Sequence, residues 1–249
     1  MTLKADSPLV TLFCPSPNIE PRKKGRKPDL LLLHYTGMES ATGALAWLTS
    51  PDSKVSCHYL VDEDGRITQM VTEAMRAWHA GQANWAGEDD INSCSIGIEI
   101  HNPGHEFGYT DFPDAQMKAV VALCRDILGR NDIPPQRVLA HSDVAPARKS
   151  DPGEKFDWSR LAKAGIGLWV APEPVGSNDG PEPGDESEDV RSLQAALKSL
   201  GFGLEASGVY DHATRSAVCA FQRHWRPERV DGHADRSMRV TLKRLIATL

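Results

Sequence analysis

The sequence predicts an α/β protein in which helices pack against a mixed sheet, followed by a small domain of three helices. Apolar runs with the pattern of strands alternate with longer runs of helical spacing, which is typical of a sheet covered by helices. The segment 171–187 holds four prolines, three glycines and five acidic residues. Such a segment buries too little apolar surface to order itself, so we expect an extended linker there. The predicted units are a domain over 1–170, a linker over 171–187 and a domain over 188–249.

The first strong strand of the larger unit is predicted by four consecutive leucines, Leu30 to Leu33. An apolar run of this kind is typical of a buried strand, and His34 stands where it ends. Ser40 then has the residue type of a helix cap. The short helix that it would begin places its apolar residues on one face, and these are Ala41, Ala44, Leu45 and Leu48.

Two further runs predict a hairpin. Residues 58–61 and 67–71 flank Asp62-Glu-Asp-Gly-Arg66, and an Asp-Gly pair between apolar runs is a strong hairpin signal. The alternating run Ser95-Ile-Gly-Ile-Glu-Ile100 predicts another strand.

A longer helix and a short strand complete the larger unit. From Pro113 onward apolar residues recur at helical spacing, and we expect Gly129 to end the helix. The run Val138-Leu-Ala140 predicts a strand. The apolar positions of the helix are Met117, Val120, Val121, Cys124, Ile127 and Leu128.

The C-terminal unit predicts three short helices. Ser187, followed by two acidic residues, can cap the first helix, and Gly201 can end it. The pattern Gly-x-x-Asp precedes the other two, at 208–211 and 232–235, where glycine permits a tight turn and aspartate can cap. A unit this small without a catalytic cluster predicts a targeting module rather than an enzyme. We expect its aromatic residues to form its core more readily than a glycan platform: Tyr210, Phe221 and Trp225.

Composition and charge exclude several classes of function. A net charge of −6 without a stripe of lysine or arginine argues against nucleic-acid binding. No stretch is long enough to span a bilayer, and the apolar run 9–14 is too short for an export signal. Five scattered cysteines without a CxxC pair are typical of reduced, mostly buried thiols. We therefore expect a cytoplasmic protein, with the periplasm or cell envelope as the alternative, and no obligate protein partner.

Three residues at strand ends predict an open metal site. His34 and His141 each follow an apolar strand, and Asp151 closes the loop after His141. Two imidazoles and one carboxylate suit Zn²⁺, and three protein ligands leave one tetrahedral position for water and substrate. The pattern indicates a hydrolase.

Four motifs then resemble a known family. They are Leu33-His-Tyr-Thr36, Trp78-His-Ala-Gly81, Ser95-Ile-Gly-Ile-Glu99 and Ala140-His-Ser-Asp-Val-Ala-Pro-Ala-Arg-Lys-Ser-Asp-Pro152. Over residues 28–165 the chain is similar to the zinc-dependent N-acetylmuramoyl-L-alanine amidases of the amidase-2 type, which include the peptidoglycan-recognition proteins. Residues 187–249 resemble a three-helix peptidoglycan-binding domain.

The resemblance implies roles for particular residues. The zinc ligands would be His34, His141 and Asp151, the catalytic acid Glu99, and the cation that stabilises the oxyanion Lys149. Some phage members place a catalytic tyrosine where this chain has Cys57, so Glu99 would carry the proton transfer. The implied substrate is peptidoglycan or a 1,6-anhydro-muropeptide, cut between the lactyl group of N-acetylmuramic acid and L-alanine. Substrate contacts are expected from Tyr35, Trp78, His79 and Ala145.

Several alternatives stay open from the sequence. Trp78 and His79 could instead belong to core and loop, and His58 is interpreted as a packed histidine rather than a fourth ligand. The remaining histidines are expected at the surface: His101, His105, His212, His224 and His233. A non-catalytic peptidoglycan-recognition protein on the same fold is the alternative function. The His-Tyr-Thr motif resembles the outer-membrane-associated bacterial subgroup, which fits action on intact wall rather than cytoplasmic recycling.

Overall fold

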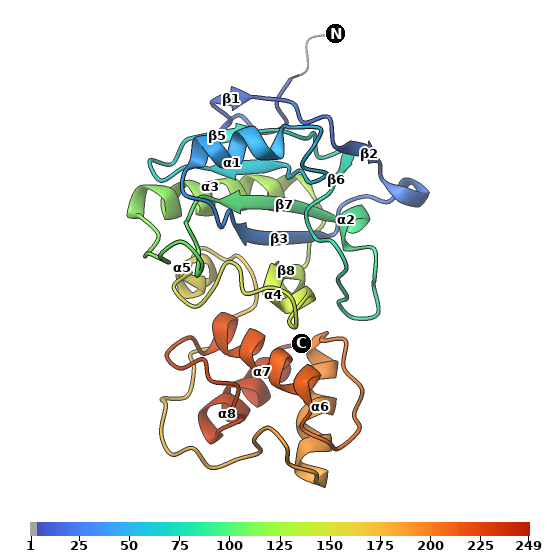
Figure 1. Ribbon diagram of the computed structural model, residues 1–249, viewed down its shortest axis with the longest axis vertical. Helices are drawn as coiled ribbons and strands as arrows, with labels where there is room; N and C mark the ends of the chain where they lie inside the picture. Colours follow the sequence, from blue (N-terminus) through green and yellow to red (C-terminus); the bar gives the residue numbers. More distant parts are fainter. Residues whose placement is uncertain (1–3) are drawn as a thin grey trace.

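The computed structural model describes residues 4–249 and contains a six-stranded mixed sheet with helices packed against it (Figure 1). The strand order is β1-β5-β4-β7-β3-β8, and β4 and β5 form the one antiparallel pair of this sheet. A separate antiparallel pair joins β2 and β6. The predicted fold class is confirmed. The strands are β1 (Leu12–Phe13), β2 (Ile19–Pro21), β3 (Leu30–Tyr35), β4 (Tyr59–Val61), β5 (Ile67–Gln69), β6 (Met75–Ala77), β7 (Ser95–Ile100) and β8 (Val138–Ala140).

The helices follow the predicted order, with short additions. Ser40 and Ser187 accept hydrogen bonds from the first turns of the helices that they were expected to cap, and Asp211 and Asp235 do the same. The helices are α1 (Ala41–Leu48), α2 (Ile91–Cys94), α3 (Asp114–Arg130), α4 (His141–Val144), α5 (Trp158–Lys163), α6 (Glu188–Leu200), α7 (His212–Trp225) and α8 (Arg236–Ile246), with 3₁₀ turns at Lys23–Gly25 and Pro135–Arg137.

One helix boundary was predicted wrongly. Helix α3 continues through Gly129 and ends at Arg130, where the amide of Asn131 donates to the carbonyl of Ile127. A glycine that ends a helix usually has a positive φ, and Gly129 does not, so the helix continues through it. Sequence spacing located the helix but not its last turn.

Strand β3 is buried on both faces and divides the core. Leu31 and Leu33 pack with α3 on one face of the sheet. Leu30 and Leu32 pack on the other face, in a cluster that also contains residues of the C-terminal helices. Since side chains alternate along a strand, His34 continues the face of Leu30 and Leu32. The face that carries His34 is therefore the one turned toward the C-terminal helices.

The C-terminal helices join the sheet-containing region through α7, which packs against α4, and through Phe202 after α6, which forms a β-bridge with Trp85. Segment 171–187 contains no helix or named strand, and its Glu186 forms an isolated β-bridge with Val209. The segment runs along the C-terminal helices, because the amide of Glu173 donates to Thr241 and the carbonyl of Pro181 accepts from Ala234. These hydrogen bonds hold the segment against the C-terminal helices.

The described residues contain no helix long and apolar enough to cross a bilayer. All five cysteines are free thiols. Cys57, Cys94 and Cys124 are buried, whereas Cys14 and Cys219 are partly exposed.

Candidate active site

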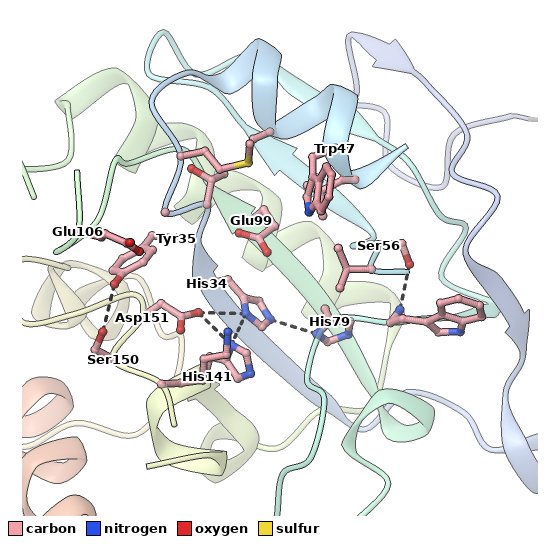
Figure 2. Close-up of a pocket in the computed structure, with 18 of the residues that line it drawn as sticks. His34, Tyr35, Trp47, Ser56, His79, Glu99, Glu106, His141, Ser150 and Asp151 are labelled. Atoms are coloured by element: carbon pink, nitrogen blue, oxygen red, sulfur yellow. Dashed lines mark hydrogen bonds and ion pairs between the residues drawn. The ribbon is translucent and has the colours of Figure 1, made fainter. Parts of the chain in front are cut away.

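His34, His141 and Asp151 meet in one small cluster (Figure 2). The Nδ1 atoms of the two histidines lie 2.9 Å apart. Oδ2 of Asp151 lies 3.1 Å from Nδ1 of His34 and 3.0 Å from Nδ1 of His141. Three donor atoms at this spacing can all contact one ion at roughly 2.0–2.2 Å, the range of zinc–nitrogen and zinc–oxygen bonds. The structure therefore brings together the three residues that the sequence selected.

The cluster lies at the carboxyl edge of two parallel strands, where the loop that carries Asp151 also returns. His34 is the fifth residue of β3, and His141 begins α4 directly after β8. Because β3 and β8 are parallel neighbours, their ends meet at one edge. The loop after α4 returns to the same edge, where the amide of Ser142 donates to the carbonyl of Asp151.

Outer partners orient both imidazoles. Nε2 of His141 lies 3.0 Å from the carbonyl of Ala80, so it carries the proton and leaves Nδ1 free to bind a metal. Nε2 of His34 lies 3.0 Å from Nδ1 of His79, and Nε2 of His79 lies 3.2 Å from Ser95. A donor chain from His34 through His79 to Ser95 likewise leaves Nδ1 of His34 unprotonated.

The electrostatics of the cluster favour a neutral imidazole on His34 and an ionised carboxylate on Asp151. Burial and the neighbouring His141 lower the pKa of His34 to about 4. Burial would raise the pKa of Asp151, but the two histidines hold it well below its usual range. These are the protonation states that metal binding requires, because a metal and a proton compete for the same atoms.

Glu99 lies beside this cluster without joining it (Figure 2). It pairs with His34 in the register of β7 and β3, so the two side chains share a face of the sheet. Burial, followed by the nearby charge of Asp151, raises the pKa of Glu99 well above its usual value, and Lys149 opposes this. Its buried Oε2 has no hydrogen-bond partner among residues 4–249. A buried carboxyl group with a raised pKa in a cavity is a candidate for proton transfer.

A cavity of about 440 Å³ opens above the cluster. Lys149 lines it together with the cluster residues and Glu99, so the proposed catalytic groups share one space. Tyr35, Trp78 and His79 also line the cavity, as expected for substrate contacts. Ala145 does not line it. That residue is buried and its amide donates to the carbonyl of His141, so the expected contact of Ala145 with substrate stays a prediction.

The sequence patterns did not single out Trp47, which lines the cavity, or Gly97, which lies against the His79 ring. Trp47 lies on α1 and is 51% exposed at the cavity, where its ring can cover a ligand. Gly97 lies within β7, where a Cβ atom would stand 2.7 Å from the His79 ring. A glycine inside an apolar strand often marks a close approach, and that signal was present in Ser95-Ile-Gly-Ile-Glu99.

Two histidines expected at the surface are buried. His101 is 3% exposed and contacts Thr36, and His224 is 1% exposed and contacts Asp143 of α4. His58 is packed, as expected: its Nδ1 accepts from the Gly97 amide, and it lies outside the metal-type cluster. Tyr210, Phe221 and Trp225 are core residues of the C-terminal region, also as expected.

Comparisons with protein families match both regions of the chain. Residues 24–154 match the family described as N-acetylmuramoyl-L-alanine amidase. Residues 186–242 match a putative peptidoglycan-binding domain.

Two curated relatives are similar in sequence. N-acetylmuramoyl-L-alanine amidase AmiD of Escherichia coli is 37% identical over 218 residues, which cover 83% of this chain and 78% of AmiD. 1,6-anhydro-N-acetylmuramyl-L-alanine amidase AmpD of Enterobacter cloacae is 33% identical over 164 residues, which cover 59% of this chain and 86% of AmpD.

Two solved structures resemble the fold along most of its length. One is E. coli AmiD in complex with anhydro-N-acetylmuramic acid-L-Ala-D-gamma-Glu-L-Lys, with a TM-score of 0.75, 33% identity and 92% of each chain covered. The other is AmpDH3 of Pseudomonas aeruginosa in complex with anhydromuramic pentapeptide, with a TM-score of 0.77 and 33% identity. That likeness covers 92% of this chain and 95% of the other.

Proposed function

This chain belongs to the family of N-acetylmuramoyl-L-alanine amidases, and we propose that zinc held by His34, His141 and Asp151 serves its reaction. The reaction is hydrolysis of the amide bond between the lactyl group of N-acetylmuramic acid and L-alanine, in peptidoglycan or muropeptides. The observation that carries this proposal is the triangle of three donor atoms beside Glu99 in one cavity.

The donor set fits zinc chemically. Two neutral imidazoles and a carboxylate are a common catalytic zinc set, and the three residues that would hold the ion line the cavity. When bound, zinc polarises the scissile carbonyl and acidifies water at its open position. His79 and the carbonyl of Ala80 fix the two imidazoles, which preserves the site geometry through a catalytic cycle.

Glu99 and Lys149 would perform the remaining chemistry. Glu99 takes a proton from the attacking water and passes it to the amine of L-alanine as the carbon–nitrogen bond breaks. The ammonium of Lys149 stabilises the negative charge that develops on the carbonyl oxygen. Cys57 is buried, and burial and the nearby charge of Glu99 raise its pKa well above the usual range, so it stays protonated and does not compete with Glu99.

Zinc content and amide hydrolysis test the proposal together. We expect about one zinc per chain, and release of free peptide from a muropeptide that chelation abolishes and added zinc restores. His141→Ala should lose both zinc and activity, whereas His212→Ala changes an exposed histidine on α7 and should lose neither. Bound zinc without release of peptide would favour the non-catalytic recognition protein and overturn the enzyme mechanism.

The choice of substrate needs a second comparison. Both solved complexes carry anhydromuramic peptides, which supports a soluble 1,6-anhydro-muropeptide as substrate. The match of residues 186–242 to a peptidoglycan-binding domain supports action on intact wall. Turnover of the muropeptide and of purified sacculi by one preparation distinguishes these roles. Cytoplasmic location stays a prediction, with the cell envelope as the alternative.

A further inference from the structure

A second cavity adjoins the active-site cavity across the loop 146–150. It has a volume of about 280 Å³ and lies between this loop and helix α7 of the C-terminal region. Arg148, Lys149 and Ser150 line both cavities, so the two spaces lie on either side of the same short segment. A ligand leaving the active-site cavity over this segment would reach α7.

The wall that α7 contributes is basic. Arg215, Cys219 and Arg223 recur at intervals of four residues, which places them on one face of the helix. Together with Arg148 and Lys149 they put four cationic side chains around the cavity, in a chain whose net charge is −6. None of its lining residues is acidic. A cavity of this composition favours an anionic ligand.

Among residues 4–249, the carboxylate that pairs with one of these four cationic side chains is Glu154, at the edge of ion-pair distance from Arg223. Glu154 is 3.9 Å from Nε of Arg223 and is held at 3.1 Å by His105. Nε of Arg223 is buried and has no hydrogen-bond partner among residues 4–249. Arg215 makes one long contact of 3.5 Å with the carbonyl of Asp231. Guanidinium groups that make few contacts beside a cavity can form charge-assisted hydrogen bonds to a carboxylate.

Helix α7 is fixed against the active-site loop, so its arginines have a defined position. Nδ1 of His224 lies 2.6 Å from Oδ2 of Asp143, and both residues are buried. Nε1 of Trp225 donates to the carbonyl of Leu168 at 2.9 Å. These contacts lie next to Arg223 in sequence and hold the helix against α4.

We propose that Arg215 and Arg223 bind the carboxylates of the stem peptide on the substrate. The inference rests on the proposed function and adds a role for the C-terminal region within the reaction. The peptide bound to the AmiD structure contains D-gamma-Glu, which is linked through its γ-carboxyl and so keeps a free α-carboxylate. An extended peptide advances about 3.3–3.6 Å per residue, so two residues bring this carboxylate about 7 Å beyond the scissile bond. A stem peptide that crosses the loop 146–150 would place this carboxylate at the basic cavity.

Kinetics with two matched peptides test this assignment. One is the anhydromuramyl tripeptide, in which D-gamma-Glu and the terminal L-Lys each carry a free carboxylate. The other peptide carries amides in place of these two carboxylates. Arg215→Gln and Arg223→Gln should each raise KM about fivefold on the carboxylate peptide, as expected for a partly solvated charge contact. Their kcat should stay within about twofold, because neither side chain contacts the reacting atoms. On the diamide peptide both variants should match the wild type.

Arg236→Gln is the matched control, because Arg236 is an exposed basic residue of the same region that lies outside the cavity. It should change neither peptide's KM. An equal rise in KM on both peptides would mean that the arginines are structural, and unchanged KM on both would mean that they do not bind substrate; either result overturns the inference while leaving the amidase intact. Failure of the wild type to cut either peptide would overturn the proposed function and this inference with it.

Discussion

Replacing His224 by alanine should weaken the attachment of the C-terminal helices to the metal-binding loop. His224 is 1% exposed, and its Nδ1 donates to the buried carboxylate of Asp143 at 2.6 Å. Burial lowers the pKa of His224 although Asp143 opposes the shift, so the imidazole is neutral at pH 7. The ring also stacks on Trp158 and Trp225, at centroid distances of 3.6 Å each.

The expected loss of stability follows from these contacts. A hydrogen bond to a charged group contributes about 1.5–3 kcal/mol. Each aromatic stack adds about 0.5–1.5 kcal/mol beyond the buried area. The variant should therefore lose about 4 kcal/mol. The carboxylate of Asp143 would keep a single partner, the amide of Ala140.

Urea unfolding, followed by tryptophan fluorescence and by far-UV circular dichroism, measures this loss. His212→Ala is the control, because it removes an exposed histidine from the first turn of the same helix and should change stability by less than about 0.5 kcal/mol. Zinc affinity should also fall, by roughly tenfold, since α4 begins at His141. A loss below about 1 kcal/mol for His224→Ala, with unchanged zinc affinity, would refute the claim that this pair supports the loop.

Three further predictions concern the active-site face of the sheet. Glu99→Gln should lower kcat by about 10²–10⁴ with zinc content unchanged, because an amide cannot take up the proton of the attacking water; retained turnover would exclude Glu99 from the proton transfer. Gly97→Ala should cost about 1–3 kcal/mol, because the new Cβ would meet the His79 ring at 2.7 Å; an unchanged thermal midpoint would contradict this. Burial, with the charge of Arg22 adding to it, lowers the pKa of His58 to about 3, so the unfolded state binds the proton first on acidification. The free energy of unfolding is therefore highest above pH ~6.5, where His58 is neutral in both states. It falls by about 1.3 kcal/mol by pH 5.5, because the unfolded state then binds the proton. His58→Asn should remove this part of the pH dependence in urea titrations at pH 7.5 and 5.5, and an equal slope in variant and wild type would show that other groups cause it.

Local sequence predicted the longer helices and strands and the three residues of the metal-type cluster. The leucine run before His34 could only be a buried strand, and four side-chain caps were predicted from single residues, Ser40, Ser187, Asp211 and Asp235. These features depend on neighbours within a few positions, so the chain reveals them directly. The residues of the metal-type cluster were found because each closes an apolar strand or the loop after one.

Only the tertiary structure decided how these residues are supported. His79 orients His34 across 45 residues of sequence, and the space it needs exists because Gly97 lies opposite. His224 was expected in solvent, yet it is buried against Asp143 because helix α7 packs on α4. The sequence predicted a C-terminal domain after a linker, and the structure adds that its helices share an apolar cluster with Leu30 and Leu32 of the sheet. Such contacts depend on which faces meet when distant segments pack. The periodicity of a segment shows which of its faces is apolar, but not which other segment this face will contact.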